Sequence, residues 1–187
     1  FNSFDAAFTV QDGQVMASGE VYNHAYRYVD WLLTVPLLLV ELILVMNLSA
    51  KETKSKAWSL GLAAALMVAL GYPGEIATTS ADRWLWWGLS MLPFLYIIHA
   101  LFFGLRDSIK QQPDNVKGLV STACWVTIIA WSFYPIVYLF PLLGIGSSDV
   151  ALEVGYSVAD IVAKAGFGLL IFNIARAKSK ASGYVQA

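Results

Sequence analysis

The chain has 187 residues, of which 58% are hydrophobic and 13% charged, and its twelve Lys and Arg nearly balance its thirteen Asp and Glu. A soluble domain carries about 25% charged residues and a nucleic-acid binder needs a basic surface, so both classes are excluded. A single cysteine, Cys124, excludes a disulfide framework and a paired-cysteine metal site. The remaining class is an all-α protein that crosses a membrane several times.

Residues 1–26 precede the first long apolar stretch, and they are mixed in character and acidic. No initiator Met, basic segment or signal-like apolar run opens the chain. We interpret residues 1–26 as an extracellular loop that enters from a missing upstream helix. Residues 27–187 are then the transmembrane domain, with a short cytoplasmic tail.

Five stretches are apolar and long enough to cross a hydrocarbon core, which takes about 20 helical residues. They are residues 27–48, 57–73, 84–105, 117–143 and 149–175. The second is the weakest, but its Ala and Gly residues suit close helix packing in a bilayer. The expected polar connectors are residues 49–56, 73–83, 106–116 and 144–148.

Charge placement predicts the orientation of the chain. Nine of the twelve basic residues fall on one side of the predicted spans: Lys51, Lys54, Lys56, Arg106, Lys110, Lys117, Arg176, Lys178 and Lys180. Positive charge favours the cytoplasmic side, so we expect a multi-pass protein of the cell membrane with a cytoplasmic C-terminus. Near the outer end of the third span, Trp84, Trp86 and Trp87 form either an interfacial aromatic belt or a ligand wall.

Five ionisable residues fall within or at the edge of the spans: Arg27, Asp30, Glu41, Asp160 and Lys164. A charge at bilayer depth costs several kcal/mol, so it normally faces the bundle interior, is paired and marks a functional path. Arg27 could instead reach the interface, and the two acids of the first span could lie at helix ends. Lys164 is too far from either end, so it is neutral, paired or covalently modified. Asp160, one helical turn earlier, is its nearest acid in sequence, and a purely structural ion pair remains the alternative.

Polar residues of the first span share one face of the helix. At 100° per residue, Thr34 lies about 40° and Glu41 about 20° from Asp30. Arg27 lies about 60° from Asp30. Because Asp30 and Glu41 are about 16 Å apart along the axis, the spacing suits protons moving between stations, not two carboxylates acting on one substrate bond.

Aromatic residues of the fourth span follow a helical period. Trp131, Tyr134 and Tyr138 stand at positions i, i+3 and i+7. Such a stripe is often core packing. If this stripe faces the buried lysine, it would instead line a long, narrow, apolar pocket together with Trp31 and Phe94.

Five segments, which follow one another along almost the whole chain, carry a resemblance to a known family. They are Arg27–Glu41 (RYVDWLLTVPLLLVE), Leu66–Glu75 (LMVALGYPGE), Arg83–Phe94 (RWLWWGLSMLPF), Trp131–Pro135 (WSFYP) and Asp160–Leu170 (DIVAKAGFGLL). The chain resembles the microbial (type 1) rhodopsins, and among them the proton-pumping proteorhodopsin and xanthorhodopsin branch. The family has a seven-helix retinal-binding bundle, and this sequence is similar to its third to seventh helices.

The resemblance implies a cofactor, retinal, bound as a Schiff base to Lys164. It implies that Asp30 is the counterion and proton acceptor, Asp160 the second counterion and Glu41 the cytoplasmic proton donor. Arg27 and Thr34 match further positions of the proton path. Matches to positions of the retinal pocket are Trp31, Met67, Gly71, Trp87, Phe94, Trp131 and Tyr134.

The function implied is a light-driven outward proton pump. The alternative is a retinal photosensor that signals to a partner protein, but sensory members commonly lack the carboxylate matched by Glu41. A transporter without chromophore would leave Lys164 a free amine. An enzyme is not expected, because the sequence has no phosphate-binding glycine loop, HExxH helix or nucleophile–base pair.

Other features follow from the same resemblance. The expected partners are the lipid bilayer, protons and further copies of the chain in a pentamer or trimer. Trp87 stands where antenna-carrying relatives have Gly, so a carotenoid antenna is not expected. Leu38 matches a colour-tuning position of the family, and a leucine there is typical of green-absorbing members. Archaeal pumps release protons through a pair of glutamates. At the matching place this sequence has Leu152, with Glu153 displaced by one position, so proton release by that route is not expected.

Overall fold

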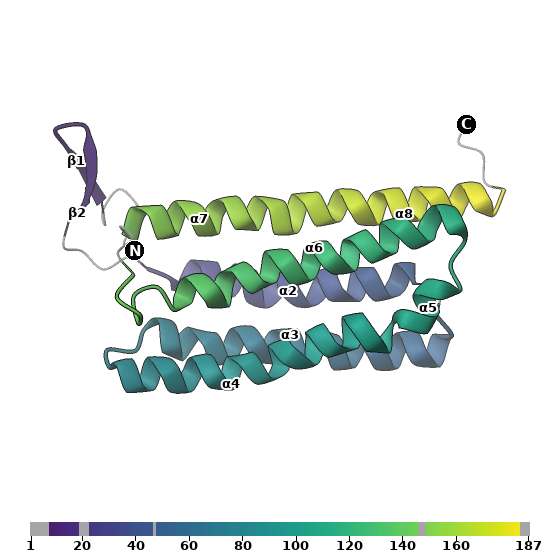
Figure 1. Cartoon of the computed structure of the whole chain (residues 1–187), viewed down its shortest axis with the longest axis horizontal. Coiled ribbons are helices and arrows are strands. Elements are labelled where there is room, and N and C mark those ends of the chain that lie inside the picture. The colour runs from purple at the N-terminus through teal and green to yellow at the C-terminus, as the bar shows by residue number, and fades with distance from the viewer. Residues whose placement is uncertain (1–7, 19–22, 47, 146–148, 184–187) are drawn as a thin grey trace.

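The computed structural model describes residues 8–18, 23–46, 48–145 and 149–183, without the side chains of residues 8, 15, 17 and 149–153. Its long helices lie side by side in one bundle, as Figure 1 shows. They are α2 (Ala25–Val45), α3 (Ala50–Glu75), α4 (Ser80–His99), α6 (Asp114–Tyr138), α7 (Asp149–Ile161) and α8 (Phe167–Ala181).

Two π-helical turns extend these helices. Residues Ala100–Gly104 join α4 to the short α5 (Arg106–Lys110), and Val162–Gly166 joins α7 to α8 in one continuous rod (Figure 1). Within the described residues, five helical segments are therefore long and apolar enough to cross a membrane. The predicted all-α membrane fold with five spans is confirmed.

Some predicted span ends are wrong. The second span begins at Ala50, because the Ser49 hydroxyl caps α3 and accepts the Glu52 backbone N–H at 3.3 Å. The Glu52 carboxylate in turn accepts the Ser49 backbone N–H at 3.3 Å, which completes a capping box. Most of the connector predicted at 49–56 is therefore helix.

The other spans also differ at their ends. Part of the connector predicted at 106–116 is helical, since α5 follows directly on the third span and α6 begins at Asp114. The fourth span ends at Tyr138, not at 143, and a turn with Gly144 in the left-handed region (φ 66°) follows it. The last span runs on to Ala181.

Residues 1–26 contain more than the predicted loop. Strands β1 (Phe8–Gln11) and β2 (Gln14–Ala17) pair antiparallel. Asp12 (φ 50°) and Gly13 (φ 77°) form the turn between them, and an Asp-Gly pair with two positive φ angles is the preferred two-residue hairpin connection. The hairpin lies at the end of the bundle where α2 and α7 begin (Figure 1).

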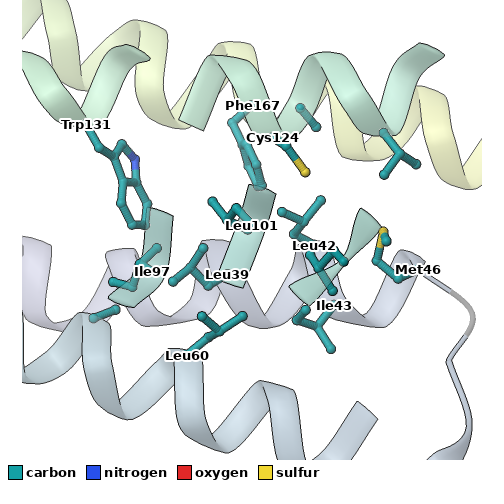
Figure 2. Packing of buried hydrophobic residues seen from close by; sticks show 14 of the residues in the cluster. Leu39, Leu42, Ile43, Met46, Leu60, Ile97, Leu101, Cys124, Trp131 and Phe167 are labelled. Carbon is teal, nitrogen blue, oxygen red and sulfur yellow. The ribbon is translucent and has the colours of Figure 1, made fainter. Parts of the chain in front are cut away.

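Packing fixes the order of the helices. Helix α3 packs against both α2 and α4, and α6 packs against α8. Leu39, Leu42 and Ile43 of α2 are fully buried. Figure 2 shows them meeting Leu60 of α3 and Phe167 of α8 in the apolar core. Helix α2 therefore contacts both α3 and α8.

Candidate functional site

A lysine and two carboxylates meet between α2 and the α7–α8 rod. Lys164 lies in the π-helical turn between α7 and α8, and such wide turns are frequent at functional sites. Its Nζ pairs with Asp30 of α2, and with Oδ2 of Asp160 at 3.3 Å. The exposed fraction is 27% for the Lys164 side chain, 22% for Asp160 and 48% for Asp30. The structure thus joins residues 134 positions apart in the chain into one ionic cluster.

The two carboxylates have different surroundings. Trp31 Nε1 donates to Asp160 Oδ1 at 3.0 Å, and the Tyr134 hydroxyl donates to the same oxygen at 2.6 Å. These bonds fix the Asp160 carboxylate between α2 and α6. Asp30 is more open, and its backbone oxygen accepts a hydrogen bond from the Thr34 hydroxyl at 2.8 Å. Asp160 is therefore a fixed acceptor, whereas Asp30 has room for a further bond to its carboxyl group.

A pocket of about 860 Å³, its open mouth included, has Lys164 and Asp160 in its lining. Its wall is mostly apolar and aromatic, and comes from α2, α3, α4, α6 and the α7–α8 rod. The structure brings together in this wall all seven residues that the resemblance assigned to a retinal pocket: Trp31, Met67, Gly71, Trp87, Phe94, Trp131 and Tyr134.

Local contacts shape the wall. The Trp87 indole donates to the Pro135 carbonyl at 3.1 Å, one of the last four carbonyls of α6, which have no partner within the helix. Trp87 is thus a pocket wall, whereas Trp84, which meets it edge to face at 5.7 Å, is 41% exposed. A Cβ on Gly71 would lie 3.4 Å from the Tyr28 ring, so a larger residue there would narrow the pocket.

Arg27 lies over aromatic rings at the α2 end of the site. Its Cζ is 5.8 Å from the Trp31 ring centroid and 4.8 Å from that of Tyr156, within the range of cation–π attraction. Tyr156 in turn stacks on Tyr134 at 5.9 Å. Tyr156 was not among the predicted site residues, although it stands one helical turn before Asp160 and therefore on the same face.

Glu41 lies apart from this cluster. It is exposed on α2, about 16 Å along the axis from Asp30. Its neighbours Leu37 and Leu44 are 58% and 62% exposed, so the described residues leave this face of α2 uncovered. The side chains of Leu152 and Glu153, also considered above, lie outside the described residues.

Comparisons with known proteins match most of the chain. The sequence profile of the bacteriorhodopsin-like protein family matches residues 4–178. Archaerhodopsin-2 of Halobacterium sp. (strain aus-2) is 32% identical over 83% of this chain and 60% of its own length. Green-light absorbing proteorhodopsin of the gamma-proteobacterium EBAC31A08 is 33% identical over 80% of this chain and 60% of its own. The chain thus spans less than two thirds of these relatives.

Solved structures agree with the sequence relatives. The crystal structure of xanthorhodopsin, described as a light-driven ion pump with dual chromophore, is 48% identical, with a TM-score of 0.87 over 96% of this chain and 73% of its own. Thermophilic rhodopsin is 43% identical, with a TM-score of 0.85 over 95% of this chain and 72% of its own. The fold, the site and these matches show that the chain belongs to the bacteriorhodopsin-like family of microbial rhodopsins.

Proposed function

We propose that this protein is a light-driven outward proton pump, with retinal bound at Lys164. Members of the bacteriorhodopsin-like family carry retinal as their chromophore. The observation that carries the proposal is the position of Lys164, whose side chain lines an aromatic pocket and whose amine is paired with carboxylates from two helices.

The pocket fits a long apolar polyene. Aromatic rings line its length, and Gly71 leaves space beside the Tyr28 ring. The Lys164 amine is the nucleophile that an aldehyde needs to form an imine. Retinal bound in this way supplies absorption of visible light and a change of shape on illumination.

Asp30 is the proposed proton acceptor of the Lys164 nitrogen. The two groups are in contact, and a proton that moves between them converts an ion pair into two neutral groups. Asp160 is held in place by hydrogen bonds from Trp31 and Tyr134. Asp30 is the more exposed of the two carboxylates, and it is the one proposed to receive the proton.

Glu41 is the proposed donor that returns a proton to the Lys164 nitrogen. It stands on the same helix as Asp30, nearer the end of the bundle where α2 ends. Lys51, Lys54 and Lys56 follow that end, so the positive-inside rule makes it cytoplasmic. Protons taken up there and released at the other end would move outward.

We expect Glu41→Gln to slow reprotonation of the Lys164 nitrogen by about 100-fold, since a positioned proton donor contributes 10²–10⁴-fold. Absorbance recovery after a flash measures this rate. The absorption maximum should stay the same, because Glu41 is about 16 Å from Asp30. Glu41→Asp keeps the carboxyl group and should recover most of the rate, whereas an unchanged rate in Glu41→Gln would refute the donor role.

Illumination of cells that express the complete protein tests the pump directly. We expect acidification of the medium that a protonophore abolishes. The alternative function, a photosensor, predicts a coloured protein without acidification.

We also propose that the protein assembles into pentamers or trimers. A carotenoid antenna is not part of the proposal, because Trp87 occupies the pocket wall at the position where antenna-carrying relatives have Gly.

A further inference from the structure

One side of α3 faces away from the apolar core of the bundle. Helix α3 packs against α2 and α4, and its residues Leu60 and Ala64 are buried in that core. At 100° per residue, the opposite side carries a row of exposed residues, each within about 60° of the first. This row, the outer face of α3, consists of Lys51, Lys54, Trp58, Leu62 and Leu66.

The outer face changes character along the helix axis. Lys51 and Lys54 lie in the first turns of α3, at the end of the bundle that charge placement makes cytoplasmic. Trp58 follows one turn later and is 71% exposed, and tryptophan is enriched where lipid headgroups meet the hydrocarbon. Leu62 and Leu66 continue the row and are also exposed. Lysine, tryptophan and leucine therefore occur in the order of phosphate, glycerol and acyl chain within one leaflet.

The two lysines of the outer face have no acidic partner in the part of the chain that the structure describes: no carboxylate there lies within 4.0 Å of either amine. Glu52 is adjacent in sequence, but its carboxylate accepts the Ser49 backbone N–H at 3.3 Å and the Ser49 hydroxyl at 2.6 Å. The first turn of a helix carries the positive end of its dipole, so Lys51 and Lys54 do not stabilise α3 there. Their charge is available to an anion from outside the chain.

Other lysines at this end of the bundle are engaged. Lys110 and Lys117 each pair with the aspartate three residues before them, at 3.2 Å and 3.1 Å. Lys56 donates to the Gly104 backbone oxygen at 3.0 Å, which holds the start of α3 against the π-helical turn before α5. Figure 1 shows α5 at the end of the bundle where α3 begins. Positive charge is thus compensated on α5 and α6 and left uncompensated on the outer face of α3.

We propose that the outer face of α3 binds an anionic phospholipid of the cytoplasmic leaflet. The headgroup phosphate lies between the amines of Lys51 and Lys54, which are three residues apart and therefore neighbours on the helix surface. The Trp58 indole contacts the glycerol region, and an acyl chain follows Leu62 and Leu66. A zwitterionic lipid offers the same acyl chain but no net charge, so the two lysines select the anionic lipid. This inference requires that α3 crosses the membrane, and it does not depend on pumping.

Photo-crosslinking tests this inference on the complete protein, supplied with retinal and placed in phosphatidylcholine bilayers. The probes are phosphatidylglycerol and phosphatidylcholine with the same photoreactive acyl chain, and mass spectrometry measures the label on Trp58–Leu66. We expect phosphatidylglycerol to label this segment about 25-fold more than phosphatidylcholine, since each lysine near an anionic headgroup contributes about fivefold. The double variant Lys51→Gln/Lys54→Gln should label equally with both probes, whereas Lys51→Arg/Lys54→Arg should keep the preference. A preference that is unchanged in the glutamine variant would overturn the inference.

The matched control is Lys110→Gln/Lys117→Gln, which removes the same charge from the same end of the bundle but from lysines that are already paired. It should change the preference by less than twofold. An equal loss in both glutamine variants would assign the preference to the total charge of this end and overturn the inference. Absence of label from either probe on Trp58–Leu66 would also overturn it, because a second copy of the chain would then cover this face. The labelling needs no pumping, so a protein that fails to acidify the medium contradicts only the proposed function.

Discussion

Lys164→Ala is expected to remove all visible absorption from the protein supplied with retinal. The reason is covalent: among the residues that line the described pocket, Lys164 has the only amine. Without that amine no imine can form, and an aldehyde held by apolar contacts alone does not absorb as a protonated imine does. The absorption spectrum after addition of all-trans retinal measures the effect.

Two controls separate loss of the anchor from loss of the fold. Lys180→Ala removes an exposed lysine from α8, the helix that follows Lys164 in the same rod, and should leave the spectrum unchanged. Retinal condensed beforehand with a short alkylamine should enter the Lys164→Ala pocket and restore part of the visible band, because Asp30 and Asp160 remain to pair with its nitrogen. Borohydride reduction followed by mass spectrometry of the parent should place the chromophore on Lys164. A label on another residue would contradict the assignment.

The helical spans could be predicted from composition because each needs only local information. Apolar stretches of about 20 residues separated by polar ones identify membrane helices. The differences between prediction and structure also have local causes: the Ser49–Glu52 capping box begins α3, and the Asp12–Gly13 turn forms the hairpin. Both are short motifs that the sequence itself contains.

The candidate site could be predicted only in part from spacing. Asp160 and Lys164 are one turn apart on one helix, so their contact follows from the helical period. Contact between Asp30 and Lys164 depends on which helices are neighbours, and only the resemblance supplied that. The same limit explains why the contact between His24 and Glu75, 3.7 Å apart, could not be predicted. Helix periodicity gives the direction of a side chain, not the helix that it meets.

Trp84 and Trp87 show this limit at one turn of α4. The sequence left both an aromatic belt and a ligand wall open for them. The structure gives each residue a different place, since Trp87 bonds to Pro135 of α6 and lines the pocket whereas Trp84 is largely exposed. Packing of α4 against α6 decides between the two readings, and this packing is not encoded in the three tryptophans themselves.

Asp30→Asn should abolish light-driven acidification and shift the absorption maximum to the red. An amide cannot take the proton of the Lys164 nitrogen, so we expect the initial rate of acidification to fall by at least about 100-fold, the lower limit for loss of a positioned acid or base. The colour changes because a carboxylate beside the cationic nitrogen stabilises charge located there. Excitation moves that charge along the polyene, and it costs less energy once the carboxylate is gone.

Asp160 sharpens this prediction, because Asp30→Asn leaves it beside Lys164 with its bonds to Trp31 and Tyr134. If Asp160 were an equivalent acceptor, acidification would continue in Asp30→Asn. We expect it to stop, since the two donors already occupy the carboxylate of Asp160 and fix its position. Asp107→Asn, which alters an exposed carboxylate on α5, should pump and absorb as the parent does. Full pumping by Asp30→Asn would transfer the acceptor role to Asp160 and reverse the order of the two carboxylates.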